Sequence, residues 1–223
     1  MKKIVILIIA VFLITGCSVK YHVVINEDLT LTEEAKMTGT QELFDNYYKT
    51  TKTNVLKSFL EIYQGVLTEN NYQYELIQDE TPYVLVTRKY ENANDFVNSS
   101  KLFNDYFEEI KYTEDGNMKK IETTGFLGND PDNPDRFEVR ELEISITCPY
   151  KVINHTAKEL DLNTNTYYFE LVDENDIILL EYDTSSKFNP NSELYKTIAT
   201  CLLILLAIWI VIVCVNKKNN KNK

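Results

Sequence analysis

The chain has only six glycines and two histidines among its 223 residues, and these shortages exclude several familiar kinds of site. Loops that cradle phosphate groups need closely spaced glycines, and no such run is present. His22 and His155 stand alone, without a second ligand at metal-binding spacing. The His-Glu-x-x-His and Gly-x-Ser-x-Gly motifs of common hydrolases are also missing. The sequence therefore predicts no cofactor and no enzyme of a familiar kind.

Cysteine is scarce too, and the positions of the four cysteines exclude a disulfide framework. Cys17 closes the N-terminal segment, and Cys201 and Cys214 lie in an apolar run near the other end. Only Cys148 remains in the central part, at the end of an alternating stretch that predicts a buried, unreactive thiol. The central part must therefore be held together by an apolar core.

Positive charge is rare between the two ends of the chain. The sequence has 23 Lys and Arg against 34 Asp and Glu, and six of the lysines lie in the terminal segments. The remaining 17 basic residues face 34 acids, which gives the central part a formal charge of −17. Such a charge repels nucleic acid and anionic lipid headgroups, so nucleic acid is not an expected partner.

The N-terminal segment is built like a secretory signal. Lys2 and Lys3 precede an apolar stretch, and small residues then lead to Cys17. The letters Leu-Ile-Thr-Gly-Cys that end at Cys17 resemble the lipobox of bacterial lipoproteins, in which a peptidase cuts before the cysteine. The resemblance implies that residues 1–16 are a signal peptide and that the Cys17 sulfur carries a diacylglycerol.

The C-terminal segment has the features of a membrane anchor. Thr197–Val215 carries no charge, and at about 1.5 Å per residue its length suits a membrane-spanning helix. The tail at 216–223 holds four lysines and no acid, which is typical of a cytoplasmic end. We therefore expect the protein in the cytoplasmic membrane, with residues 17–184 outside the cell and residues 185–196 as a linker.

Alternating apolar residues, the mark of a half-buried strand, recur through the central part. These stretches are 19–25, 29–35, 72–77, 83–90, 119–126, 136–148, 166–172 and 177–182. Apolar residues at three- and four-residue spacing predict an amphipathic helix from Leu43 to Leu67, with Thr40 as its N-cap. A second helix is predicted from about Asn94 to Ile110 on the same grounds. The order ββα, ββα and then strands favours an α+β fold, with two helices packed on a mainly antiparallel sheet.

The two predicted helices carry aromatic side chains at helical spacing. Such residues either fill a core or line a cavity that takes a lipid tail or another apolar group. The sequence does not separate these two alternatives. The candidate ligand-binding residues are Tyr47, Tyr48, Phe59, Tyr63, Phe103 and Tyr106.

An acidic loop offers the only candidate metal ligands. The carboxylates of Asp130, Asp132 and Asp135 suit a hard cation such as calcium. The loop lacks the register of an EF-hand, and its prolines and asparagines also suit a solvated turn. Both interpretations stay open.

Two stretches resemble the LppM-type bacterial lipoproteins. Val23 to Asp28, directly after the lipobox, is similar to that family's opening strand with Asn-x-Asp. Cys148 to Val152 and the following strand resemble its Pro-Gly-Lys-Val element and the strand after it, although Tyr150 stands where the family often has glycine and Phe169 where it often has tryptophan. The resemblance implies an exported α+β domain of poorly defined function, for which envelope or lipid binding is suggested and no enzyme activity or site residues are assigned.

Two functional hypotheses follow. The first is a noncatalytic binding or scaffold domain at the cell envelope, with a lipid or a membrane protein as its partner. The second is a metal-assisted hydrolase that acts on an envelope substrate through the loop at Asp130–Asp135. The lack of a recognisable nucleophile and base favours the first.

Overall fold

The computed structural model describes residues 17–39, 49, 54–78, 81–127, 141–190, 200–206 and 208. The chain divides into two units, one up to Phe188 and the other from Asn189. The elements of the first unit, in chain order, are β1 (Cys17–Ile25), β2 (Leu31–Gly39), α3 (Val55–Glu69), β3 (Gln73–Ile77), β4 (Tyr83–Tyr90), α4 (Ala93–Ser99), α5 (Lys101–Asn104), β5 (Phe107–Asp115), β6 (Met118–Phe126), β7 (Glu141–Thr147), β8 (Tyr150–His155), β9 (Glu159–Asp161), β10 (Thr166–Phe169) and β11 (Leu179–Lys187).

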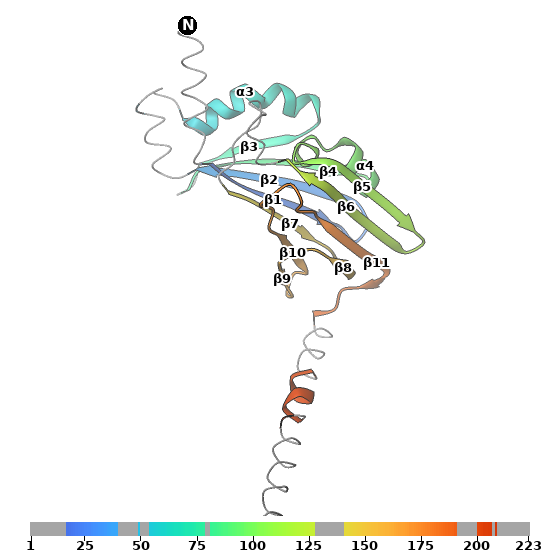
Figure 1. Ribbon diagram of the computed structural model, residues 1–223. Coiled ribbons are helices and arrows are strands. Elements are labelled where there is room, and N and C mark those ends of the chain that lie inside the picture. Colours follow the sequence, from blue (N-terminus) through green and yellow to red (C-terminus); the bar gives the residue numbers. More distant parts are fainter. Residues whose placement is uncertain are drawn as a thin grey trace, which may run out of the picture. The chain divides into compact units, whose positions relative to one another are not determined.

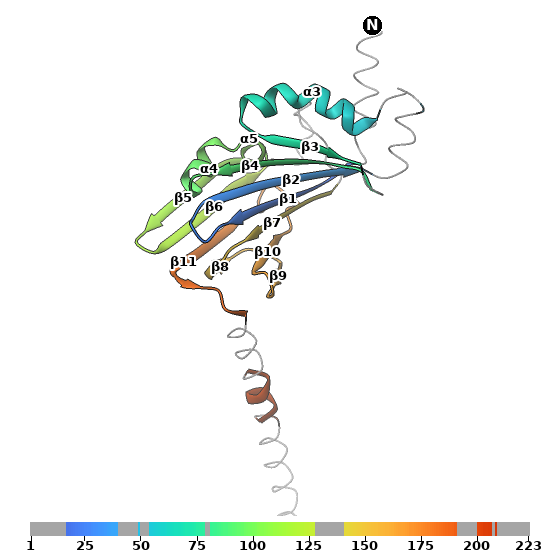
Figure 2. The same ribbon diagram turned by 180° about the vertical axis from the view of Figure 1, so that it is seen from behind.

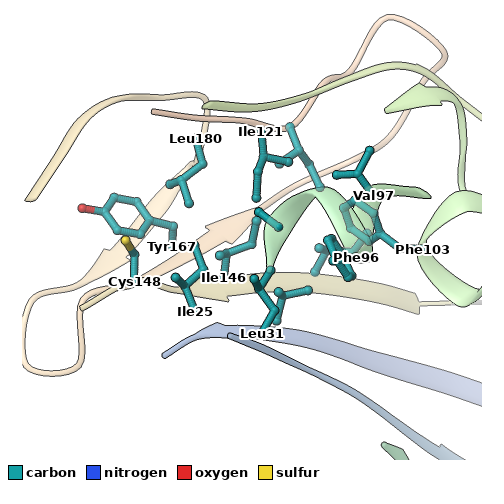
Figure 3. Packing of buried hydrophobic residues seen from close by; sticks show 14 of the residues in the cluster. Ile25, Leu31, Phe96, Val97, Phe103, Ile121, Ile146, Cys148, Tyr167 and Leu180 are labelled. Atoms are coloured by element: carbon teal, nitrogen blue, oxygen red, sulfur yellow. The ribbon is translucent and has the colours of Figure 1, made fainter. Parts of the chain in front are cut away.

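Two sheets make the framework of this unit. One has seven strands in the order β3-β4-β2-β1-β7-β10-β9, and the other has four in the order β5-β6-β11-β8. Every described pair is antiparallel except β1 with β7. The smaller sheet covers part of one face of the larger sheet (Figure 1), and Figure 2 shows the opposite face. Ile25 and Ile146 of the larger sheet meet Ile121 and Leu180 of the smaller sheet in the core between them (Figure 3).

The first hairpin follows directly from the sequence pattern. Along β1 the alternate residues Val19, Tyr21, Val23 and Ile25 are buried and point into the core, while Lys20 is exposed. The turn to β2 is fixed by Asp28, whose carboxylate accepts hydrogen bonds from the Thr30 amide and hydroxyl at 3.1 and 2.6 Å. Leu29 adopts a φ of 66° at the tip of this turn. The predicted β1–β2 and β3–β4 hairpins are both present.

The prediction of one continuous helix from Leu43 to Leu67 is wrong, because Asn54 has an extended backbone (φ −79°, ψ 129°) and the helix α3 begins after it. Asn54 caps α3, since its side chain accepts hydrogen bonds from the amides of Leu56 and Lys57 at 2.9 and 3.2 Å. The helix lies beside β3 and β4 in both ribbon views (Figures 1 and 2). Thr40 lies outside the described residues, as does the predicted helix before Asn54 except residue 49, which is helical.

The second predicted helix is wrong from its middle onward. The chain forms α4, breaks at Ser100, forms the short α5 and enters β5 at Phe107. Ser100 has an extended backbone (φ −65°, ψ 124°), and its hydroxyl accepts a hydrogen bond from the Phe103 amide, so it ends one helix and caps the next. Phe107 and Ile110 fit a helical spacing, but they pair with β6 through a hairpin that turns at Gly116 (φ 58°).

Three features of the second half were not predicted. The strands β8 and β9 have no counterpart among the predicted stretches, and the sequence pattern did not identify β1 and β7 as the one described parallel pair in the mainly antiparallel sheets. β11 continues to Lys187, past the expected start of the linker at residue 185. Lys187 pairs with Tyr150 of β8, and its Nζ lies 2.5 Å from Oε2 of Glu27.

The predicted membrane anchor requires a correction. Among the residues that the structure describes, no helix has the length and apolar character needed to span a bilayer. This finding overturns the expected spanning helix at Thr197–Val215, and with it the expected placement in the cytoplasmic membrane with a cytoplasmic C-terminus. Of that stretch the structure describes residues 200–206 and 208, which are helical.

Candidate functional site

The aromatic residues predicted to line a cavity fall into two apolar clusters. Phe103 and Tyr106 belong to the cluster between the two sheets. Phe59 and Tyr63 belong to a second cluster beneath α3. The structure therefore does not gather these four side chains into one group. The two candidates outside the described residues are Tyr47 and Tyr48.

Phe103 is part of a filled interior. It is completely buried, and its ring centroid lies 5.0 Å from that of Phe96, 5.1 Å from that of Phe107 and 5.5 Å from that of Tyr21. Figure 3 shows Phe103 beside Phe96 and Val97. Tyr106 meets the Tyr21 ring edge to face at 6.2 Å. Aromatic packing of this kind contributes to the core beyond the area that it buries.

Phe59 and Tyr63 have different surroundings. Their rings stack 4.6 Å apart on successive turns of α3, and both side chains are only half-buried. Met37 of β2 and Leu76 of β3 pack against the same cluster and are also half-buried. The apolar surface beneath α3 therefore stays partly open to solvent.

A buried carboxylate lies between the two clusters. Glu33 of β2 is completely buried, and it accepts three hydrogen bonds from hydroxyl groups. Oε1 accepts from Tyr21 of β1 and from Ser100 at 2.6 Å, and Oε2 accepts from Tyr90 of β4. Three donors from three segments thus compensate for the loss of hydration of this carboxylate.

Tyr72 extends this network toward α3. Its hydroxyl lies 3.3 Å from the Tyr90 hydroxyl and accepts hydrogen bonds from the amides of Lys101 and Leu102 at 3.0 and 3.3 Å. Those amides open α5, where a helix has no carbonyl partners of its own. Tyr72 follows α3 directly and belongs to the cluster beneath it, so the network ties α3 to α5 and to the sheet.

Arg88 closes the network on the side of α4. It lies opposite Glu33 in the β2–β4 register. Its guanidinium donates hydrogen bonds to the Ser99 carbonyl and hydroxyl at 2.8 and 2.9 Å. It also lies over the Tyr90 ring, 4.5 Å from the centroid. We call Tyr21, Glu33, Tyr72, Arg88, Tyr90 and Ser100 the Glu33 network.

The buried carboxylate affects the pKa values of the three tyrosines in the network. Burial, and then the negative charge of Glu33, raise the pKa of Tyr21 well above its ordinary value. The same two causes, in the same order, raise the pKa of Tyr72 and that of Tyr90. The three hydroxyls therefore stay protonated at neutral pH, which two of them require in order to donate to the carboxylate.

Sequence reasoning missed Glu33, although a signal was present. In the predicted second strand, the inward-facing apolar residues are Leu29, Leu31 and Ala35. Glu33 occupies the same phase, two residues after Leu31, and period-two alternation therefore predicts that it points inward as well. A charged residue in that phase is a signal for a buried polar network.

The other candidate residues stay predictions. Asp130, Asp132 and Asp135 lie outside the described residues, and with them the calcium and hydrolase hypotheses. In the part of the chain that the structure does describe, no group of three or more His, Cys, Asp or Glu side chains is arranged to hold a metal ion. Cys17 is the first residue of β1 and pairs with Gly39 of β2.

Comparisons with known proteins give a likeness of fold only. No protein-family model and no curated protein matches the chain. Among solved structures, the folded domain of the Mycobacterium tuberculosis LppM protein is similar over 79% of this chain and 92% of that one, with 10% sequence identity and a TM-score of 0.48. A likeness at this level carries no conclusion about function, and membership of the LppM-type family stays a prediction.

Replacing Glu33 by glutamine should destabilise the fold strongly. Glutamine keeps the size of the side chain, but it removes the charge that the hydroxyls bind and directs an amide donor at hydroxyl donors. We expect Glu33→Gln to lower the free energy of unfolding by about 2 to 4 kcal/mol, measured by chemical denaturation. Glu34→Gln, at the half-buried next position, should change it by less than about 0.5 kcal/mol. Equal effects of the two changes would contradict the assigned role of Glu33.

The raised tyrosine pKa values predict a loss of stability at high pH. Below about pH 10 the hydroxyls are protonated in both states, so they cause no pH dependence. Above it the unfolded chain releases protons that folded Tyr21, Tyr72 and Tyr90 retain, so the free energy of unfolding falls as pH rises. Tyrosinate absorbance should show these three ionising only as the chain unfolds, and Tyr90→Phe should make the fall shallower. Ionisation of all 15 tyrosines in a single step near pH 10, in a chain that is still folded, would refute this.

Proposed function

We propose that this chain is an exported, lipid-modified binding domain without catalytic activity, and that it takes an apolar ligand beneath α3. The observation that carries the proposal is the contrast between the two apolar clusters. Among the described residues, the cluster between the sheets has 21 buried members against ten half-buried ones, whereas the cluster beneath α3 has six against seven. Over half of the second cluster therefore has apolar surface left for a partner to cover.

The chemistry of this surface favours a flexible apolar ligand such as a lipid tail. The stacked rings of Phe59 and Tyr63 offer a flat apolar face, and Met37 offers an adaptable thioether. Each Å² of apolar surface removed from water contributes about 25 cal/mol. The central part has twice as many acidic as basic residues, so attraction to an anionic headgroup does not supply the driving force.

The described ionisable groups support binding over catalysis. The Glu33 carboxylate is buried and occupied by three hydroxyl donors, which keeps it from a substrate. Burial raises the pKa of the Cys148 thiol to about 12, so the nucleophilic thiolate does not form at neutral pH. His22 is half-buried, its Nε2 lies 3.0 Å from the Thr147 hydroxyl, and burial lowers its pKa. Nothing in the described residues favours the metal-assisted hydrolase.

Lipid modification at Cys17 also fits the start of the fold. β1 begins at Cys17 itself, so no spacer separates the proposed lipid from the sheet. Ser18, the next residue, already pairs with β2 and β7. A lipid on Cys17 would therefore hold the domain directly at the lipid phase.

Mass spectrometry tests the modification. The mature chain should begin with a diacylglyceryl cysteine at Cys17, and Cys17→Ser should block both cleavage and modification. Cys201→Ser, which changes an exposed cysteine outside the first unit, should leave both intact. A wild-type chain that begins at an unmodified Met1 would refute the proposal.

Lipid capture tests the binding function. Native mass spectrometry of the purified chain should show bound lipid, and a fluorescent fatty acid should compete with it. Tyr63→Ala removes half of the stacked pair and should weaken binding about tenfold, a loss of about 1.4 kcal/mol. Val66→Ala on the exposed side of α3 is the control and should bind normally. Affinity should persist as salt is raised, because apolar burial is not screened.

Three outcomes would contradict the proposed binding of an apolar ligand. A chain that purifies empty and ignores the fatty acid would refute an apolar ligand beneath α3. Equal losses from the two substitutions would place binding elsewhere. Release by salt would point to a charged ligand in place of an apolar one.

A further inference from the structure

We propose that β3 is a docking edge for an extended strand of a partner protein, and that this strand alternates apolar and basic side chains. The partner strand adds to the seven-stranded sheet beside β3. Its apolar side chains cover the α3 side of the sheet, and its basic side chains meet Glu75 on the opposite side. This proposal does not depend on the apolar ligand or on lipid modification.

The position of β3 in the sheet makes strand addition feasible. It is the terminal strand of the seven and, among the described residues, it pairs with β4 alone. With respect to the described residues, its other side presents backbone N–H and C=O groups of the kind that a further strand would pair with. Main-chain hydrogen bonds of that kind give affinity, and the side chains on each face give specificity.

The other sheet edges are less suited to this role. β5 carries four acids and a lysine within nine residues, a charge density that discourages pairing. β9 has only three residues, two of them acidic. β8 follows an irregular register with β11. β3 has one charged residue, Glu75, among five.

A hollow beside β3 suits a long basic side chain. It has a volume of about 280 Å³ and is lined by Gln73, Tyr74, Glu75, Leu85 and Thr87. The aliphatic stem of a lysine or arginine would pack on Leu85, and its charged end would meet the Glu75 carboxylate. Glu75 and Leu85 are direct partners in the β3–β4 register, so the two contacts lie side by side. The net charge of −11 adds long-range attraction for a basic partner.

The opposite side of β3 calls for apolar side chains. Tyr74 is 37% exposed and Leu76 is half-buried, and both alternate with the residues on the Glu75 side. Leu76 belongs to the cluster beneath α3. A partner strand with apolar residues in this phase would extend that cluster past the present edge.

A second copy of the chain is a poor occupant. If β3 paired with itself in register, in either direction, Glu75 would lie opposite Glu75. Like charges directly opposite each other on paired strands are unfavourable, and two chains of net charge −11 repel at long range. The edge therefore selects a basic partner over self-association.

A synthetic strand tests the proposal on the full chain. The probe is a short blocked peptide that alternates valine and lysine. It should bind, and hydrogen exchange should show new protection confined to β3. Glu75→Lys should weaken binding by about tenfold or more, and a valine–glutamate peptide should bind that variant in its place.

The matched control is Glu159→Lys, which makes the same charge change on β9, at the other edge of the same sheet. It should leave affinity for the valine–lysine peptide within about twofold. Equal losses in the two variants would reduce the effect to overall charge and overturn the proposal. So would undiminished binding of a peptide whose backbone amides are methylated, protection outside β3, or no binding at millimolar peptide.

Discussion

The buried carboxylate of Glu33 is the constraint on which the helical side of this domain depends. Removal of a carboxylate from water is costly unless hydrogen bonds replace its hydration, and here three hydroxyls do so. The donors Tyr21, Tyr90 and Ser100 come from β1, from β4 and from the junction of α4 with α5. If any of these segments moved away, a buried charge would lose a partner, so the segments are stable only together.

The Glu33 network lies between two apolar clusters that differ in how completely they are buried. Between the sheets, Phe103 and its neighbours fill the space with rings 5.0 to 5.5 Å apart, and little accessible surface remains. Beneath α3, Tyr72 fixes the end of the helix through hydrogen bonds, while about half of the described residues in that cluster stay half-buried. Both this polar anchoring and the buried members of the cluster hold α3 in place. A surface of that kind can accept a ligand without first unpacking a core.

The local part of this fold was predictable, and the long-range part was not. Alternation placed the β1–β2 and β3–β4 hairpins because their strands are neighbours in sequence, so pattern and pairing coincide. The parallel β1–β7 pair joins His22 to Ser145, a separation that no local pattern encodes. β5 was missed because Phe107 and Ile110 fit a helical spacing equally well, and the break at Ser100 depends on tertiary contacts. Glu33 was missed because a charged residue in a strand normally faces solvent, and only its phase with Leu31 and Ala35 indicates that it points inward.

β3 is the element that both proposed surfaces share. Its alternate residues face opposite sides, so Leu76 contributes to the cluster beneath α3 while Glu75 contributes to the hollow on the other face. A strand added along the edge would bury apolar surface next to Leu76 and order the backbone on which that side chain stands. A ligand beneath α3 would contact β3 on one face only, the face that carries Leu76. Any coupling between the two must be reciprocal in binding free energy, and β3, which contributes to both surfaces, is a short route for it.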